Sequence, residues 1–307
     1  MATVEGVFTQ TKAGVEIRPS RSLWSDAWYR FRRDRVSMVA AGVLIVLLAV
    51  SFSAPLWEQF VFHWGRDQQD LFHKLAKPTM DPVAYAFGAD EIGRSQVVRL
   101  LYAGQISLAV GFFAVIVLLI VGVSLGLVSG YLRGVTDDTV TFGVTVLNSI
   151  PTLFLLLIIA ALFSPSPPVL VLILGILGWT GTCNFVRGQT FAVREREFVT
   201  AARTIGADTA RIMTRHILPN VLPFIFVLAA IDIGQLILIE SALSYLGLGI
   251  QPPTPSWGNM LTNAREYLNS AWWLVLPPGI AIFLTVLCLY LIGDGLRDAL
   301  DPRLRSD

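Results

Sequence analysis

Six apolar stretches that are long enough to cross a membrane constrain the fold of this chain more than any other feature. Because an α-helix rises about 1.5 Å per residue, about 20 residues span a hydrocarbon core about 30 Å thick. The stretches are Val36–Trp57, Ile106–Gly130, Val140–Phe163, Pro168–Val186, Val221–Leu248 and Ala271–Ile292. The fourth supports a span least, because it contains Gly, Thr and Asn. With 54% hydrophobic and 15% charged residues, the sequence predicts an all-α, polytopic membrane protein with six transmembrane helices.

Basic residues are spread unevenly over the segments that join these stretches. If the N-terminus is cytoplasmic, the two terminal segments and the segment Arg187–Arg215 lie inside and contain most of the arginines. The basic residues that then fall outside are Arg66, Lys74, Lys77, Arg94, Arg99 and Arg265. All but the last belong to one long loop, and long loops follow the positive-inside rule weakly. The rule therefore predicts an N-in and C-in topology.

A water-soluble, arginine-bearing segment separates the fourth and fifth stretches. It is Glu197–Asn220, with the sequence EFVTAARTIGADTARIMTRHILPN. A first helix is predicted from apolar residues that recur at i, i+3, i+4 and i+7, namely Phe198, Ala201, Ala202 and Ile205. Gly206 can end this helix in the left-handed conformation, and Asp208 can cap a second one. The two alanines leave a shallow surface on which another protein could pack.

Polar residues interrupt two of the apolar stretches. Asn148 precedes a proline in the third stretch, and Asp232 and Glu240 lie in the fifth. An ionised acid at the centre of a membrane costs about 2.5–3.5 kcal/mol, so each should face protein or water. These side chains could line a pathway or form structural hydrogen bonds. Likewise, the small residues of Gly122-x3-Gly126-x3-Gly130 could pack on a partner subunit or on this chain's own helices.

Several chemistries are not predicted. The sequence contains no G-x-x-x-x-G-K-[ST] phosphate loop, so this chain should not hydrolyse ATP itself. Its histidines are isolated, and no Cys/His cluster has the spacing of metal ligands. No Ser/His/Asp grouping suggests nucleophilic catalysis. We therefore expect no enzyme activity, no cofactor, no metal site and no nucleic-acid partner.

The segment Glu197–Asn220 resembles the "EAA" coupling loop of ABC-transporter permeases. That pattern is Glu-Ala-Ala, three residues, Gly, nine residues and Ile-x-Leu-Pro. The matching residues are Ala201, Ala202, Gly206, Leu218 and Pro219, whereas Thr200 replaces the Glu and His216 replaces the Ile. The resemblance implies contact with a cytoplasmic ATPase by Thr200, Ala201, Ala202, Gly206, Ala207, Leu218 and Pro219.

Other segments resemble the C-type permease of dipeptide, oligopeptide and nickel importers. They are ESALSYLGLGIQPPTPSWGNML, the tail GDGLRDALDPRLR, and FGADEIGRSQVVRLLYAGQISL before the second span. In the last of these, Ser95, Val98 and Gln105 replace the usual Asp, Ser and Arg. The resemblance extends from about Arg21 to Arg305.

This resemblance implies the type I ABC importer permease fold in the bacterial cytoplasmic (inner) membrane. The chain would form half of a translocation pathway with a second homologous permease, by alternating access. Two cytoplasmic ATPase subunits and an extracytoplasmic solute-binding protein would be its partners, and the lipid bilayer its environment. The substrate could be a dipeptide, an oligopeptide or a nickel chelate.

The expected segments follow from the spans and the resemblance. They are a polar tail 1–20, an amphipathic interfacial helix 21–35, the first span with a long outer loop 36–105, a permease core 106–293 with the coupling loop 187–220, and a cytoplasmic tail 294–307. One alternative is a self-sufficient secondary transporter or channel, whose coupling-ion site could use only Asp232 and Glu240. Another is a membrane-embedded enzyme, for which no converging catalytic residues are visible.

Overall fold

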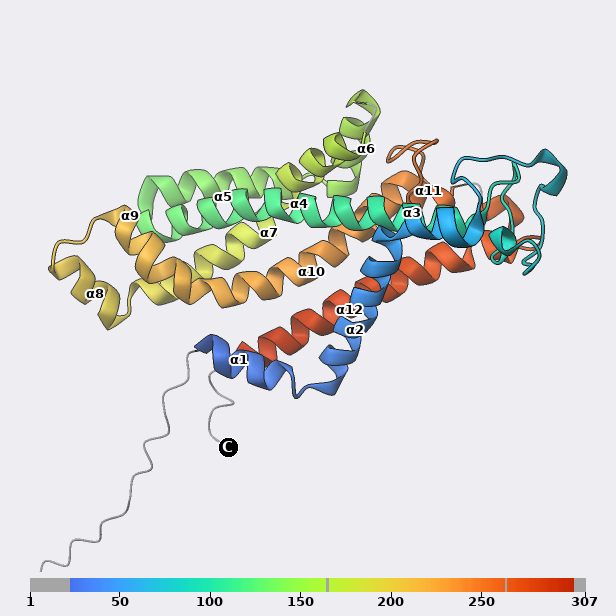
Figure 1. Cartoon of the computed structure of the whole chain (residues 1–307). Coiled ribbons are helices and arrows are strands. Elements are labelled where there is room, and N and C mark those ends of the chain that lie inside the picture. The colour runs from blue at the N-terminus through green and yellow to red at the C-terminus, as the bar shows by residue number, and fades with distance from the viewer. Residues whose placement is uncertain (1–22, 164–165, 263, 301–307) are drawn as a thin grey trace, which may run out of the picture.

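The computed structural model describes residues 23–163, 166–262 and 264–300, which form an elongated bundle of helices (Figure 1). Within these ranges the extended pairing is limited to one isolated antiparallel bridge, between Ala89 and Ser95. The all-α prediction is therefore confirmed. The predicted tail 1–20 and the last seven residues of the predicted C-terminal tail lie outside the described residues.

The six predicted spans correspond to helices of the described chain. Five helical segments are long and apolar enough to cross a membrane, and a sixth span exists if one bent pair is counted. The five are α2 (Arg35–Phe52), α4 (Gln96–Leu132), α7 (Pro167–Arg194), α10 (Leu218–Tyr245, within the continuous segment Thr209–Tyr245) and α12 (Leu276–Leu300). The bent pair is α5 (Gly134–Asn148) and α6 (Thr152–Phe163), which meet at 80°.

The third span, rather than the fourth, is the broken one. Pro151 lies in the break between α5 and α6, and proline both lacks an N–H and disfavours a helical conformation in the residue before it. The fourth span is the unbroken helix α7, and two of its glycines are packing positions. A Cβ on Gly175 would lie 2.5 Å from the Cβ of Val117, and one on Gly178 would lie 2.8 Å from Leu118.

Helix α4 lies at the centre of the bundle, against α7, α10 and α2 (Figure 1). Its glycines at 122, 126 and 130 pack directly on the backbone of α7. A Cβ at these positions would lie 2.9, 2.7 and 2.9 Å from the carbonyl oxygens of Trp179, Cys183 and Arg187. The glycine motif is therefore a seam within this chain, which decides between the two roles that the sequence left open.

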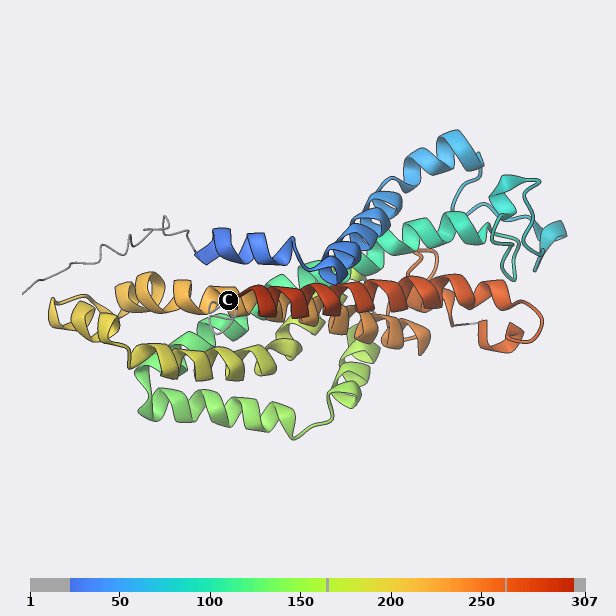
Figure 2. The same ribbon diagram turned by 90° about the horizontal axis from the view of Figure 1, so that it is seen from below.

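Helix α1 (Leu23–Phe31) lies alongside the C-terminal end of α12 in both views (Figures 1 and 2). Ala27 and Phe31 are buried against α12, where Leu296 and Leu300 belong to the same apolar cluster. The helix is present as predicted, but part of its apolar face packs on protein instead of the lipid leaflet. Trp28 remains 59% exposed.

The shorter helices gather at the two ends of the bundle (Figure 1). At one end are α8 (Glu197–Thr204), α9 (Thr209–Arg211) and the wide-turn helix η4 (Ile212–Ile217). Toward the other end are α3 (Ala54–Trp57), η1 (Glu58–Phe62), η2 (Leu71–His73), η3 (Val83–Tyr85), α11 (Trp257–Met260), η5 (Ala264–Tyr267) and η6 (Trp272–Leu274). The long loop before α4 and the segment after α10 that contains Arg265, both outside in the predicted topology, therefore share one end, and the coupling loop lies at the opposite end.

Candidate functional site

The first helix of the coupling loop, α8, ends in a glycine turn. The N–H of Ala207 donates to the carbonyl of Ala202 at 3.0 Å, and the N–H of Gly206 donates to the carbonyl of Arg203 at 3.1 Å. These two bonds form a Schellman motif, which requires a left-handed residue at the Gly206 position. Gly206 indeed has a φ of +85°. The predicted helix end at this glycine is confirmed.

The second helix, α9, is opened by Asp208. The side chain of Asp208 accepts a hydrogen bond from the N–H of Arg211 at 3.1 Å, which confirms the predicted N-cap. From this point the chain stays helical through η4 into α10, without a break. The coupling loop is therefore joined to the fifth span by helix alone.

The apolar face that was predicted for α8 is divided between the protein interior and the solvent. Val199 and Ala202 are buried, whereas Ala201 is exposed. Ile205 is 86% exposed and Phe198 is 40% exposed. The exposed apolar surface of the coupling loop, which we call the coupling face, therefore consists of Phe198, Ala201 and Ile205. Ala202 does not contribute to it, contrary to the surface inferred from the sequence.

Ala202 is buried because α8 folds back on η4. Ile212 and Ile217 of η4 are almost fully buried in one apolar cluster with Val199. Of the other residues assigned to coupling, Ala207 and Leu218 pack partly buried against this cluster, and Thr200 and Pro219 are exposed. The loop is thus a small folded unit with its own core.

Aromatic and basic side chains connect this unit to the end of α4. The guanidinium groups of Arg194 and Arg203 lie 5.5 and 5.8 Å from the ring centroid of Tyr131, the penultimate residue of α4. Arg194 also donates a hydrogen bond to the carbonyl of Tyr131. A cation that lies over an aromatic ring is attracted to the face of that ring, most strongly where water is partly excluded. Tyr131, which sequence reasoning missed, therefore joins α8 to the central helix.

Asn148 and Asp232 lie on opposite sides of α7. The hydroxyl of Thr180 donates to Oδ1 of Asn148 at 3.0 Å. The hydroxyl of Thr182 donates to Oδ2 of Asp232 at 2.9 Å. The side chain of Asn148 is exposed and that of Asp232 is partly buried. Two of the three candidate pathway residues are thus arranged around the same helix.

Glu240 is separate from that pair and fully buried. Its carboxylate accepts hydrogen bonds from the hydroxyls of Ser107, Ser241 and Ser244 at 3.0, 3.4 and 2.8 Å. Ser107 in turn accepts from the N–H of Trp257 at 3.2 Å. Glu240 therefore connects α10, α4 and the loop that contains α11, as a structural group.

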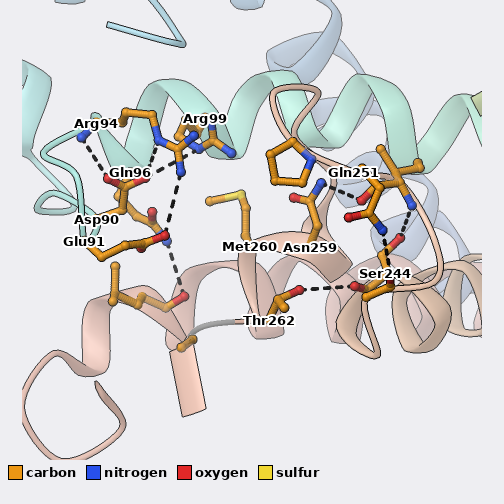
Figure 3. A pocket seen from close by; sticks show the side chains of 15 residues that line it. Asp90, Glu91, Arg94, Gln96, Arg99, Ser244, Gln251, Asn259, Met260 and Thr262 are labelled. Atoms are coloured by element: carbon orange, nitrogen blue, oxygen red, sulfur yellow. Dashed lines mark hydrogen bonds and ion pairs between the residues drawn. The ribbon is translucent and has the colours of Figure 1, made fainter. Parts of the chain in front are cut away.

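A polar cavity of about 190 Å³ lies between the start of α4 and the loop after α10 (Figure 3). On one side, Nε of Arg94 donates to Oδ2 of Asp90 at 2.6 Å, and Nε of Arg99 lies 3.8 Å from the same oxygen. On the other side, the hydroxyl of Thr262 donates to the carbonyl of Ser244 at 3.1 Å. The sequence predicted that both arginines lie in the outer loop, but it did not predict that they share the carboxylate of Asp90.

Comparison with known proteins identifies the class of this bundle. Residues 122–306 match the family model described as "Binding-protein-dependent transport system inner membrane component". The chain belongs to this family. Residues 22–78 match a second model, described as the N-terminal TM domain of oligopeptide transport permease C. The predicted resemblance is therefore confirmed over most of the described chain.

Individual relatives agree with the family match along most of the chain. An oligopeptide transport system permease protein of Haemophilus influenzae is 36% identical over 93% of this chain and 90% of its own length. Its counterpart in Escherichia coli K12 is 38% identical, covering 93% of each chain. A dipeptide transport system permease protein of Bacillus subtilis is 35% identical over 94% of this chain and 88% of its own length.

The family defines the class of molecule and its location. The chain is a multi-pass inner-membrane permease, and its relatives are permease subunits of transport systems, not enzymes. Importers of this family work with ATPase and solute-binding partners in general. The alternative of a self-sufficient secondary transporter or channel is not supported by these relatives.

Proposed function

We propose that this chain forms half of the translocation pathway of an ATP-driven peptide importer, together with a second, homologous permease. Two cytoplasmic ATPase subunits drive the transport, and an extracytoplasmic binding protein delivers the substrate. Relatives named for oligopeptide and dipeptide transport support a substrate made of a few amino acids. Because those names belong to the relatives, uptake assays with labelled di- and oligopeptides have to establish the substrate here.

The observation that carries the proposed coupling to ATPases is the coupling face on α8. Ile205 is 86% exposed at the end of the molecule that the arginine distribution assigns to the cytoplasm. A large apolar side chain at the tip of a small folded unit, with Ala201 and Phe198 beside it, is suited to insertion into a groove on a partner. The coupling loop then moves with that partner.

The connections of the coupling loop indicate how such a movement would be transmitted. Displacement of α8 acts on α4 through Tyr131 and on α10 through the continuous helix of α9 and η4. The glycine seam fixes α7 to α4, so both move together. Alternating access follows if the two positions of the loop have different contact energies with the two states of the ATPases.

An experiment on the coupling face tests this function. In Ile205→Glu, a charge enters the coupling face, and we expect the complex to lose its ATPases or its substrate-stimulated ATP hydrolysis. The matched control is Phe72→Glu, which changes a 98% exposed side chain in the loop at the opposite end of the bundle. The control should retain the ATPases. Full ATPase retention and undiminished peptide uptake by Ile205→Glu would remove α8 as the coupling element.

A further inference from the structure

Arg99 is a buried cation at the edge of the polar cavity between α4 and the loop after α10. Its side chain is only 4% exposed. The guanidinium nitrogen Nη1 is buried and has no hydrogen-bond partner in the described part of the chain. Because a buried charged donor is costly without an acceptor, such groups in folded proteins face a partner. The acceptor for Nη1 therefore has to come from elsewhere.

The carboxylates nearest to Arg99 are engaged with other groups. Oδ1 of Asp67 lies 3.5 Å from Nη1 of Arg99, and Oδ2 of Asp90 lies 3.8 Å from its Nε. Both distances exceed the range of about 2.7–3.2 Å for an N–H···O hydrogen bond. Asp67 is 42% exposed and accepts from Nε of Arg66 at 3.0 Å. Asp90 accepts from Nε of Arg94 at 2.6 Å and from two backbone N–H groups. Neither carboxylate therefore forms a hydrogen bond with Arg99.

The cavity beside this guanidinium group has room for a small solute. Its volume is about 190 Å³, and it separates Arg99 from the loop after α10 (Figure 3). On the far wall, the amide nitrogens of Gln251 and Asn259 donate to backbone carbonyls of their own loop. The second carboxylate of the lining, Glu91, lies 3.9 Å from Nη2 of Arg94. Among the described residues, the far wall thus offers no anion to Arg99.

This cavity lies at the outer end of the bundle, beyond the hydrocarbon core. Helix α4 has 37 residues and is about 55 Å long, whereas the core is about 30 Å thick. Arg99 is the fourth residue of this helix, and the predicted span begins only at Ile106. The arginine distribution assigns this end to the extracytoplasmic side. A solute of the outer aqueous space therefore reaches the cavity without crossing the membrane.

We propose that this cavity is a binding site for the carboxylate group of a small acid or of a peptide, and that Arg99 binds it. The planar guanidinium group presents paired N–H donors that match the two oxygens of a carboxylate. A chloride ion lacks this paired geometry and would leave most of the cavity unfilled. The site belongs to the permease itself, so the inference goes beyond the proposed function and does not depend on it.

A bound carboxylate would strengthen a junction that already exists at this end. Nε2 of Gln96 donates to the carbonyl of Leu274 at 3.3 Å, and Nε1 of Trp273 donates to the carbonyl of Ala89 at 3.2 Å. Both bonds join the start of α4 to the segment before α12. A ligand on Arg99 adds a contact with the loop after α10. Because a ligand that binds only the folded state stabilises it, binding should raise the thermal unfolding midpoint.

Binding of acetate to the purified, complete transporter tests the site. The measurements are the thermal unfolding midpoint and the NMR line width of labelled acetate, at constant ionic strength with chloride as the reference salt. Acetamide is the matched neutral probe, because it has the shape of acetate without its charge. We expect acetate to raise the midpoint and to bind saturably, and acetamide to do neither. Equal effects of acetate and acetamide, or of acetate and chloride, would overturn the proposal.

Substitutions locate the bound acetate. Arg99→Gln should weaken acetate binding by at least about tenfold. Lys77→Gln, which removes an exposed positive charge from the same outer loop, is the control and should bind acetate normally. Because loss of a buried charge can disturb folding, Gln251→Trp provides a second variant that fills the cavity from an exposed position. Undiminished acetate binding by assembled Arg99→Gln or Gln251→Trp protein would overturn the site.

Competition identifies the source of the carboxylate. Dialanine and dialanine amide differ only in the carboxylate group, and each is added to the transporter with labelled acetate in the absence of ATP. Displacement of acetate by dialanine alone would support the site and identify a peptide terminus as its ligand. Saturable acetate binding that neither compound displaces would support the site for small free acids. Equal displacement by both compounds would overturn recognition through the carboxylate.

Discussion

Glu240 is held by three serine hydroxyl groups, and through two of them it fixes the loop after α10. Ser107 accepts from the N–H of Trp257 at 3.2 Å, and Ser244 accepts from the N–H of Ile250 at 3.0 Å. Each hydroxyl thus donates to the carboxylate and accepts from the loop backbone. A buried polar network of this kind stabilises the fold only while all of its members are satisfied.

The role of Glu240 predicts a difference between two substitutions. Glu240→Gln keeps the shape and most of the hydrogen bonds, so assembly and uptake should stay near normal. Glu240→Ala leaves the serine hydroxyls without their acceptor and should cost about 1–3 kcal/mol. Thermal unfolding of the purified complex and peptide uptake are the measurements. Well-assembled Glu240→Gln protein without uptake would instead indicate an essential charge.

Gly206 occupies the one position of the coupling loop where the backbone itself demands glycine. Although a Cβ would meet no atom within 4 Å, the φ of +85° disfavours any residue with a side chain. Gly206→Val should cost at least about 1–2 kcal/mol locally and displace α8 from α9. We expect inserted, paired permease whose ATP hydrolysis no longer responds to substrate.

Gly206→Asn is the matched control for that substitution, because asparagine tolerates the left-handed conformation better than valine. It should retain much of the substrate-stimulated ATP hydrolysis. Undiminished uptake by Gly206→Val would show that the Schellman turn is dispensable for coupling. A substitution at Ala202 would not test the coupling face in the same way. Ala202 is 5% exposed, so Ala202→Glu would disrupt the core of the coupling loop.

At the scale of elements, the seam between α4 and α7 depends on bare backbone contacts. Even the Cβ of alanine at position 126 would lie 2.7 Å from the carbonyl oxygen of Cys183. Gly126→Ala should therefore separate the two helices and destabilise the permease by about 1–3 kcal/mol. The thermal unfolding midpoint in detergent measures this effect.

Gly279→Ala on α12 is the control for the seam, because a Cβ there meets no atom within 4 Å. Within a helix, alanine is favoured over glycine by about 1 kcal/mol where its Cβ meets no neighbour, so this variant should be neutral or slightly more stable. Equal stability of the two alanine variants would mean that the seam tolerates a wider helix spacing.

At the scale of the whole molecule, the two outer loops and the coupling loop lie at opposite ends of the bundle (Figure 1). With the arginine asymmetry, this arrangement predicts which ends face water on each side of the membrane. Single cysteines at Ser166 and Thr254 should react with an impermeant thiol reagent when the inner membrane is intact. A cysteine at Thr209 should react only after permeabilisation.

The native cysteines do not complicate this labelling, because Cys183 and Cys288 are both buried. Reaction at position 209 with the membrane intact would reverse the topology. The topology would also be reversed if the cysteines at 166 and 254 both failed to react in intact membranes but reacted after permeabilisation. Either pattern would place the coupling loop on the side without ATP.

The sequence alone determined the features that depend on local chemistry. Apolar length indicated the spans, and the glycine at 206 and the aspartate at 208 marked the ends of the coupling helices. These features are readable because each depends on residues within one or two helical turns. The family resemblance was readable for the same reason, as continuous motifs.

Only the tertiary structure decided which surfaces and side chains meet. The hydroxyl of Ser107 reaches Glu240 across 133 positions of sequence. Ala202 is buried because α8 packs against η4, and the glycines of α4 pack on α7 of the same chain. Gly175 and Gly181 look alike in sequence, yet one is packed and the other open. A periodic pattern shows that a helix has faces, but which face is covered depends on helices that are distant in sequence.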